Sequence, residues 1–232
     1  MSALSLLPWQ DTLALAWFLA VWIGYAGYSR VASRRGATLL AVTNLWRHRW
    51  MMQVARRDQR IVDGNITQTL AGSPSFFASA TMIVIGGVLA LFGATDQAAT
   101  VLGNMPFAVP TTRTVFEVKL MVLAAIFVFA FFRFTWAIRQ YTFVALILGA
   151  MPTPSEFAAG HTDGEAYAKR AAAVVGSAAE SFNDGVRAYY FAFAVLAWFF
   201  SPLAFAVAAA LVVAILYGRE FRSGVLHLLR DH

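Results

Sequence analysis

The stretch that decides the fold class is VFEVKLMVLAAIFVFAFFRFTWAIRQYTFVALILGAM, residues 115–151. It is compatible with one helix over its whole length, roughly 54 Å at 1.5 Å per residue, whereas the hydrocarbon core of a bilayer is about 30 Å thick. Only part of it fits inside the membrane. We therefore expect residues 115–135 to span the bilayer and residues 136–151 to continue as a helix that emerges from the bilayer or lies on it.

The composition of the whole chain agrees with a membrane protein. Of its 232 residues, 59% are hydrophobic and 13% are charged, whereas about 25% are charged in a soluble domain. The apolar content excludes an intrinsically disordered chain, and the lack of cysteine excludes a disulfide-built secreted module. An ordinary water-soluble enzyme is equally hard to reconcile with these values.

Three further stretches are apolar and long enough to cross a membrane: residues 9–28, 76–94 and 189–217. The first lacks the positively charged start of a cleavable signal peptide, so we expect it to be retained. The second follows Ser73-Pro74, a pair typical of a helix start. The third contains a proline and has room for one tilted or kinked crossing, but not for two.

Together these stretches predict an all-α integral membrane protein, with residues 1–232 forming a single membrane domain. We expect four transmembrane helices, plus amphipathic cytoplasmic helices within residues 29–72 and 136–187.

The distribution of arginine predicts the orientation. The segment between the first two spans contains Arg30, Arg34, Arg35, Arg47, Arg49, Arg56, Arg57 and Arg60, whereas the next connecting segment contains only Arg113. Because basic loops stay on the cytoplasmic side, we expect a multi-pass protein of a bacterial inner (plasma) membrane with its N-terminus outside. Four spans then place the C-terminus outside as well, although Arg219, Arg222 and Arg230 run against the rule there. Basic residues spread between apolar stretches do not indicate a nucleic-acid partner.

Residues 36–63 have the pattern of an amphipathic basic helix. Its apolar stripe consists of Val42, Trp46, Trp50 and Val54. On the neighbouring stripe, Arg49, Arg56 and Arg60 are candidates for binding anionic lipid headgroups at the membrane surface, or an acidic partner. The alternative is that this helix packs against the spans and only enforces their orientation.

Three pairs of threonine and glutamate have the spacing of a capping box: Thr153 with Glu156, Thr162 with Glu165, and Thr114 with Glu117. The first two predict two short helices, the second ending at Asn183-Asp184-Gly185. The third pair gives Glu117 a structural role at the start of a span.

The candidate site lies near the predicted inner boundary of the membrane. Its members are Arg133, Arg139, Gln140 and Arg187. Arginine binds phosphate and carboxylate oxygens two at a time, so these residues are candidates for a pocket that takes an anionic lipid headgroup or an acidic partner segment. The alternative is that each arginine extends separately to the membrane interface.

No pattern in the chain indicates catalysis. The four histidines, His48, His161, His227 and His232, lie outside the predicted spans. No nucleophile triad, phosphate loop or dinucleotide fingerprint is present in the sequence, and His161 with nearby acids lacks the ligand spacing of a metal site. We therefore predict no enzyme activity, no metal and no cofactor.

Several motifs occur in an order that resembles the domain of unknown function 599 family, multi-pass membrane proteins of bacteria and plants. They are Arg49-Trp50-Met51, Arg60-Ile61-Val62-Asp63, Ser75-Phe76-Phe77-Ala78-Ser79, Phe132-Arg133-Phe134-Thr135-Trp136 with Arg139-Gln140, Phe182-Asn183, Arg187-Ala188-Tyr189-Tyr190-Phe191 and Arg219-Glu220-Phe221. The resemblance covers about residues 44–222. It implies an integral membrane protein and no particular activity.

These observations favour a non-enzymatic structural or accessory membrane component that binds a protein partner or anionic lipid through its basic cytoplasmic side. A small transporter or channel component is the first alternative, and a lipid-modifying membrane enzyme is the second. Small residues at four-residue spacing, such as Gly86 and Ala90, fit contacts within the chain and a homo-oligomer seam equally well.

Overall fold

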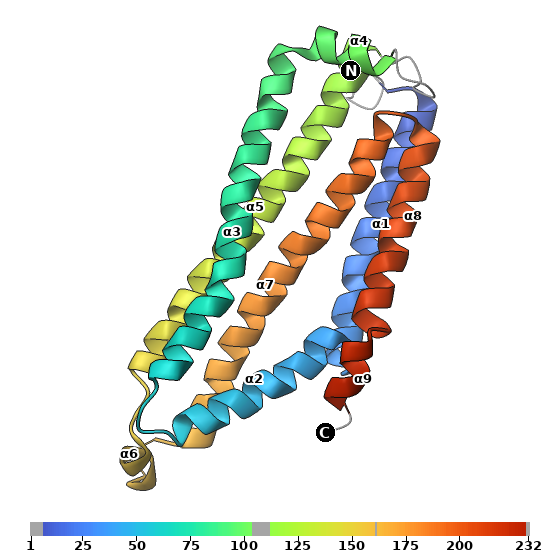
Figure 1. Ribbon diagram of the computed structural model, residues 1–232. Helices are drawn as coiled ribbons and strands as arrows, with labels where there is room; N and C mark the ends of the chain where they lie inside the picture. The colour runs from blue at the N-terminus through green and yellow to red at the C-terminus, as the bar shows by residue number, and fades with distance from the viewer. Residues whose placement is uncertain (1–6, 104–111, 161, 231–232) are drawn as a thin grey trace. The chain divides into compact units, whose positions relative to one another are not determined.

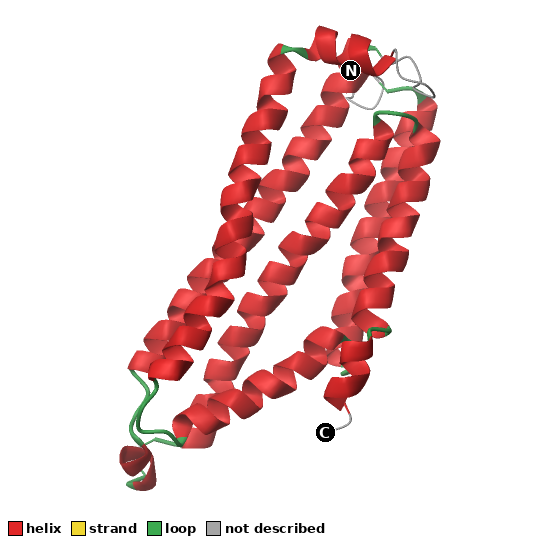
Figure 2. Ribbon diagram, in the orientation of Figure 1, coloured by secondary structure: helices red, strands yellow, loops and turns green. Residues whose placement is uncertain are grey.

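The fold is described from a computed structural model for residues 7–103, 112–160 and 162–230. All regular structure within these ranges is helical, with no strand (Figure 2). The helices in chain order are α1 (Trp9–Arg34), α2 (Leu39–Ala55), α3 (Ile61–Gly93), α4 (Thr95–Gly103), α5 (Arg113–Gly149), α6 (Pro154–Ala158), α7 (Gly164–Trp198), α8 (Pro202–Phe221) and α9 (Gly224–Arg230), labelled in Figure 1.

Among the described residues, four helical segments are long and apolar enough to cross a membrane: Trp9–Arg34, Ile61–Gly93, Arg113–Gly149 and Pro202–Arg230. The all-α class and the number of four candidate spans are confirmed, and so is the continuation of the third helix past residue 135. α3 has 33 residues and α5 has 37, which correspond to roughly 50 and 55 Å. Both are longer than a hydrocarbon core of about 30 Å.

The second candidate span starts earlier than the sequence predicted. α3 begins at Ile61, so Ser73-Pro74 is not a helix start and Pro74 lies inside the helix. Proline lacks the N–H that would bond to the preceding turn, a cost that nearby hydroxyl groups reduce within membrane helices. Ser75 Oγ donates to the carbonyl of Ala71 at 2.9 Å, next to the Leu70 carbonyl that the proline leaves without its backbone N–H partner.

The prediction of a single crossing over residues 189–217 is wrong. α7 ends at Trp198, and α8 begins at Pro202. The Ser201 hydroxyl caps the new helix by accepting a hydrogen bond from the Ala204 N–H at 3.0 Å, and proline fits the first helical position, where its missing N–H costs nothing. Pro202 therefore starts a helix instead of kinking one, and residues 189–198 belong to α7.

The chain groups into two compact units, which are described separately. Unit 1 consists of Met1–Val31, Ala80–Ala130 and Val186–Arg219, and unit 2 of Ala32–Ser79, Phe131–Gly185 and Glu220–His232. The sequence predicts a single domain over residues 1–232. In the structure, α3, α5 and α7 each contribute residues to both units. The two segments predicted to be cytoplasmic, 29–72 and 136–187, fall almost entirely in unit 2.

The core of unit 1 is aromatic. Phe18 of α1 is fully buried and contacts Phe191 of α7 and Phe205 of α8, with ring centroids 5.7 and 4.8 Å apart. Phe205 in turn stacks on Trp198 at 4.7 Å. Such pairs add to the packing energy beyond the area that they bury, and here they join three helices.

The core of unit 2 lies between α2, α5 and α7, where Met51, Val144 and Val175 are fully buried. Beside it, the Phe134 ring of α5 packs so close to α7 that a Cβ added at Gly185 would lie 2.5 Å from Phe134 Cε1. The prediction that Asn183-Asp184-Gly185 ends a helix is therefore wrong. The glycine admits the phenylalanine ring while α7 continues through it.

The C-terminal helix α9 packs on α2 (Figure 1). Arg230 Nη2 donates to the carbonyls of Gly36 and Ala37 at 3.2 and 2.9 Å, and Trp46 Nε1 of α2 donates to the carbonyl of Leu229 at 3.4 Å. α9 thus lies beside the arginine-rich segment, whereas the sequence predicted the two on opposite sides of the membrane. The cause is the chain reversal before Pro202: α7 (Gly164–Trp198) is not among the four apolar segments, but it runs through both units between α5 and α8 and so adds one passage of the chain.

Two of the helix starts after α5 were predicted as capping boxes. The box of Thr153 and Glu156 is confirmed at the start of α6. At the second start the cap is Asp163, whose Oδ1 accepts hydrogen bonds from the N–H groups of Glu165 and Ala166 at 2.9 and 3.3 Å, so the box with Thr162 is wrong. The helix that follows is not short, because α7 contains 35 residues.

The predicted box at the start of α5 is also displaced. Thr112 Oγ1, not Thr114, accepts a hydrogen bond from the Val115 N–H, at 3.4 Å. Glu117 forms an ion pair with Arg113 one turn earlier, at 2.9 Å.

The position of α9 makes a topological prediction that the lack of native cysteine makes easy to test. Single substitutions Asp58→Cys, His227→Cys and Gln97→Cys place a thiol at exposed positions. We expect a membrane-impermeant maleimide to label residues 58 and 227 from the same side, the cytoplasmic one, and residue 97 from the other. Labelling of residues 58 and 227 from opposite sides would contradict the packing of α9 on α2.

Candidate functional site

A polar seam joins α5 and α7 in unit 2. The Gln140 amide is satisfied with its oxygen accepting from Ser177 Oγ at 2.6 Å and from Trp136 Nε1 at 3.2 Å, and with its nitrogen donating to Ser181 Oγ at 2.9 Å. Gln140 and Ser181 are both buried. Since a buried amide without partners costs free energy, this network fixes which faces of the two helices meet.

Arg133 extends the same seam through an ion pair. Its Nη2 lies 2.7 Å from Asp184 Oδ2, and the Asp184 side chain is 7% exposed. A buried carboxylate needs this partner, because an unpaired charge in such a position is strongly unfavourable. The guanidinium of Arg133 is therefore used to join α5 to α7.

The other two residues of the predicted pocket lie elsewhere. Arg139 is exposed on another face of α5. Arg187 belongs to unit 1, where it is buried and donates to Ser29 Oγ of α1 at 2.8 Å. The structure thus brings Arg133 and Gln140 together in the seam, while Arg139 and Arg187 have different surroundings.

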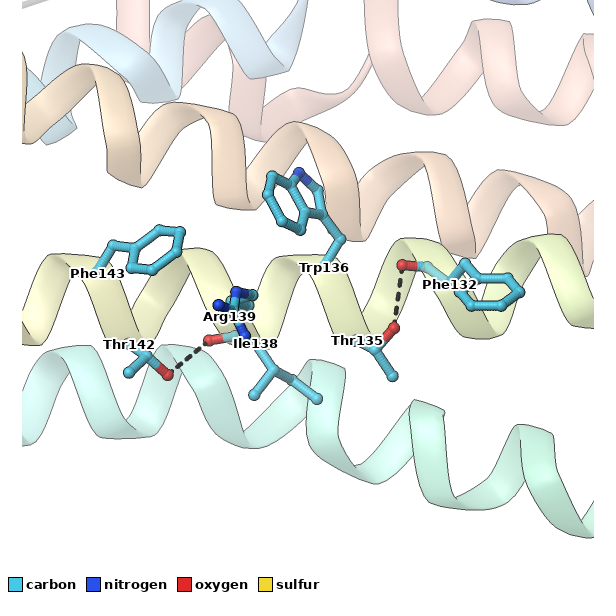
Figure 3. Close-up of a pocket in the computed structure, with 7 residues that line it drawn as sticks. All are labelled: Phe132, Thr135, Trp136, Ile138, Arg139, Thr142 and Phe143. Atoms are coloured by element: carbon cyan, nitrogen blue, oxygen red, sulfur yellow. Dashed lines mark hydrogen bonds between the residues drawn. The ribbon is translucent and has the colours of Figure 1, made fainter.

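A hollow of about 580 Å³, which we call the Arg139 surface, lies along the exposed side of α5 (Figure 3). Its lining residues are Phe132, Thr135, Trp136, Ile138, Arg139, Thr142 and Phe143. The hydroxyls of Thr135 and Thr142 donate to carbonyls of α5 itself, as the dashed lines in Figure 3 show. The Arg139 guanidinium lies 5.6 Å from the centre of the Phe143 ring and donates no hydrogen bond to any described residue.

The predicted basic helix is shorter than residues 36–63. α2 ends at Ala55, and Arg56 is its exposed C-cap residue. Arg49 does lie on the helix, with its guanidinium 4.8 Å from the centre of the Trp46 ring. Arg60 follows the helix, so the expectation that all three arginines share one helical stripe is wrong.

Arg60 has an internal role in unit 2. Its Nη1 and Nη2 donate to the carbonyls of Met151 and Pro152 at 2.5 and 2.6 Å, just after α5, and its Nε donates to the carbonyl of Val54 at 3.2 Å. Carbonyl groups near a helix end lack partners within the helix, so a cation is favourable there. Arg60 therefore holds the ends of α2 and α5 together.

Asp63 is a buried acid that the sequence analysis did not select. Its side chain is fully buried in the first turn of α3, and its Oδ1 accepts from Trp50 Nε1 at 2.8 Å and from Arg57 Nη1 at 2.9 Å. The Oδ2 atom has no partner among the described residues. These bonds join the start of α3 to α2. Asp63 could have been selected from the sequence, because it is the acidic residue of the motif Arg60-Ile61-Val62-Asp63.

Arg47 of α2 is likewise used within unit 2, where its Nη1 donates to Thr43 Oγ1 and Asn44 Oδ1, both at 2.8 Å. Burial lowers the pKa of the Arg47 guanidinium, and the nearby Tyr141 opposes this shift. An arginine starts from so high a pKa that it stays charged at neutral pH.

Unit 1 contains a buried ionic group of its own. Asp11 of α1, Lys119 of α5 and Trp198 of α7 are all buried. Asp11 Oδ1 accepts from Trp198 Nε1 at 2.7 Å and lies 3.7 Å from Lys119 Nζ, which donates to the Trp198 carbonyl at 2.8 Å. This group was not predicted from the sequence, although Asp11 and Lys119 lie inside predicted spans, where ionisable side chains are rare and costly.

No three His, Asp or Glu side chains come together as a metal site within the part of the chain that the structure describes.

The fold and these sites define a helical integral membrane protein in which the buried acids Asp11, Asp63 and Asp184 each lie beside a cation of the same unit. The family model described as a protein of unknown function, DUF599, matches residues 13–225, and the chain belongs to this family. The match confirms the resemblance found in the sequence. Searches of curated proteins and of solved structures gave no match.

The buried pair of unit 1 gives a prediction for stability. Asp11→Ala leaves the Lys119 ammonium buried without its counter-charge, so we expect the free energy of unfolding to fall by about 3–5 kcal/mol. Asp11→Ala/Lys119→Met removes both charges and is expected to recover most of that loss. Thermal unfolding of the purified proteins in one detergent compares them, and a double variant less stable than the single one would contradict the pairing.

Proposed function

We propose that this protein is a non-enzymatic accessory component of a bacterial inner membrane that binds anionic lipid headgroups through the Arg139 surface. The observation that supports this most directly is the state of Arg139. Its guanidinium is exposed in an aromatic hollow, while those of Arg60 and Arg133 are bonded within unit 2. Arg139 therefore has donors for an external anion.

The position of Arg139 along α5 suits a headgroup. It lies 26 residues after Arg113, the first residue of the helix, or roughly 39 Å along the axis. If the span enters the hydrocarbon core near residue 115, it emerges on the other side near residue 135, because the core is about 30 Å thick. Arg139 then falls at headgroup depth, with Trp136 at the boundary where aromatic side chains gather.

The chemistry of the hollow supports binding more than catalysis. Its lining includes one guanidinium and two threonine hydroxyls, and no carboxylate, imidazole or thiol. A guanidinium fork matches two phosphate oxygens, and aromatic side chains suit the upper part of an acyl chain. We place unit 2 on the cytoplasmic side, with the N-terminus outside, because thirteen of the eighteen Lys and Arg residues belong to unit 2.

A small transporter component is the second candidate. The observation that favours it is the buried pair of Asp11 and Lys119 in unit 1, because ionisable groups within spans often lie on ion pathways. The hydrogen bonds from Trp198 Nε1 and to the Trp198 carbonyl give the pair a structural role instead, so we rank this candidate below lipid binding.

The lipid proposal predicts the behaviour of an Arg139→Gln variant. We expect phosphatidylglycerol to bind the delipidated, full-length variant about fivefold more weakly than the wild type, because one charge near a membrane surface contributes about 1 kcal/mol. Binding is measured as the rise in melting temperature on addition of phosphatidylglycerol, with phosphatidylcholine for comparison. Arg139→Lys keeps the positive charge without the two parallel donors of the guanidinium. Its affinity for phosphatidylglycerol should lie between those of the wild type and Arg139→Gln.

Arg170→Gln is the matched control, since it removes another exposed arginine of unit 2 that does not line the hollow. Its response to phosphatidylglycerol should equal that of the wild type. Equal responses of the wild type and Arg139→Gln would remove the lipid proposal. A protein that copurifies with the wild type and is lost only from Arg139→Gln would assign the surface to a protein partner.

A further inference from the structure

A second hollow lies in unit 1, between α1 and α5, with a volume of about 640 Å³. Its walls run from Leu15 to Arg30 on α1 and from Val122 to Phe129 on α5, and Arg30 is the one charged residue among its lining residues. We propose that this groove holds one phospholipid, with an acyl chain between the two helices and the phosphate on Arg30. The site shares no residue with the Arg139 surface and does not rest on the function proposed for it.

The length of the groove fits an acyl chain. Leu15 and Arg30 are fifteen residues apart on one helix, or roughly 22 Å, whereas one leaflet contributes about half of a hydrocarbon core of about 30 Å. An acyl chain that extends from a phosphate at Arg30 can therefore lie entirely within the groove. Ile23 is 70% exposed, so the groove is open to surrounding lipid along its side.

The charge lies at the end where a phosphate would be. Trp9 and Arg30 of α1 are 21 residues apart, roughly 32 Å along the helix, which matches the thickness of the hydrocarbon core. Tryptophan and arginine are typical of the two boundaries of such a span. With Trp9 at one boundary, Arg30 lies at headgroup depth, at the end of an otherwise apolar groove.

Two glycines of α1 supply a matched pair of variants. Gly27 lines the groove, whereas Gly24, one turn earlier, does not. A Cβ added at either position would meet no atom within 4 Å, so both sites accept a side chain without a clash inside the protein. Gly27→Leu fills part of the groove, and Gly24→Leu makes the same change in size and hydrophobicity outside it.

The test is native mass spectrometry of the full-length protein after delipidation, with phosphatidylglycerol or diacylglycerol added in detergent. Both lipids have acyl chains, and diacylglycerol lacks the phosphate. We expect Gly27→Leu to retain roughly tenfold less of either lipid, since displacing two methylene groups from an apolar site has about this effect. Gly24→Leu should retain as much as the wild type.

Arg30→Gln should lower the retention of phosphatidylglycerol about fivefold and leave that of diacylglycerol unchanged. Ala125→Leu narrows the groove from the side of α5. It should lower the retention of both lipids as expected for Gly27→Leu, and it replaces Gly27→Leu in the test if Gly27→Leu does not fold. Equal retention by the wild type and both groove-filling variants would overturn the proposal, and so would equal losses in Gly24→Leu and Gly27→Leu. An Arg30→Gln variant that retains phosphatidylglycerol like the wild type would overturn the role of the phosphate.

Discussion

The close approach of the Phe134 ring to the backbone of α7 at Gly185 is the contact that sets how closely α5 and α7 pack in unit 2. Any side chain at position 185 would overlap the ring, and with glycine the helix continues without a break from Gly164 to Trp198. The turn after Trp198 then becomes the place where the chain reverses, and Pro202 begins a separate helix. That reversal brings the C-terminal helix α9 to α2 in unit 2.

The basic residues of unit 2 have two different roles. Arg57, Arg60 and Arg133 are bonded to an acid or to carbonyls of the same unit. The bonds of Arg60 and Arg133 join segments that lie far apart in the chain, whereas Arg57 bonds to Asp63 only six residues away. Helix ends leave carbonyl groups without partners, and arginine can donate to several at once. The arginine-rich composition thus has a structural cause as well as a topological one. Only a subset, of which Arg139 is the best-placed member, has donors for a ligand.

Buried charge is treated in the same way in both units. In unit 2, Asp63 accepts from a tryptophan and an arginine, and in unit 1, Asp11 accepts from a tryptophan and lies beside Lys119. A tryptophan N–H satisfies a carboxylate while its ring fills apolar space. Such groups stabilise one arrangement of helices over others that bury the same apolar area. Ligand sites are therefore better sought at Arg139 and Arg30, where an exposed guanidinium lies at the edge of an apolar surface.

The sequence by itself determined the all-α membrane class, the number of four candidate spans, the family and the cap at Thr153. Hydrophobic content and capping spacing act locally along the chain. The sequence also indicated which arginines to consider. It did not show that Pro74 lies within a helix, that Pro202 starts one, or that Thr162 and Thr114 are not caps, because the same residue types occur in both settings and neighbouring turns decide between them. The partners of Arg60 and Arg133 depend on contacts between segments far apart in sequence. Those contacts, and with them the choice of which arginine is left for a ligand, were decided only by the tertiary structure.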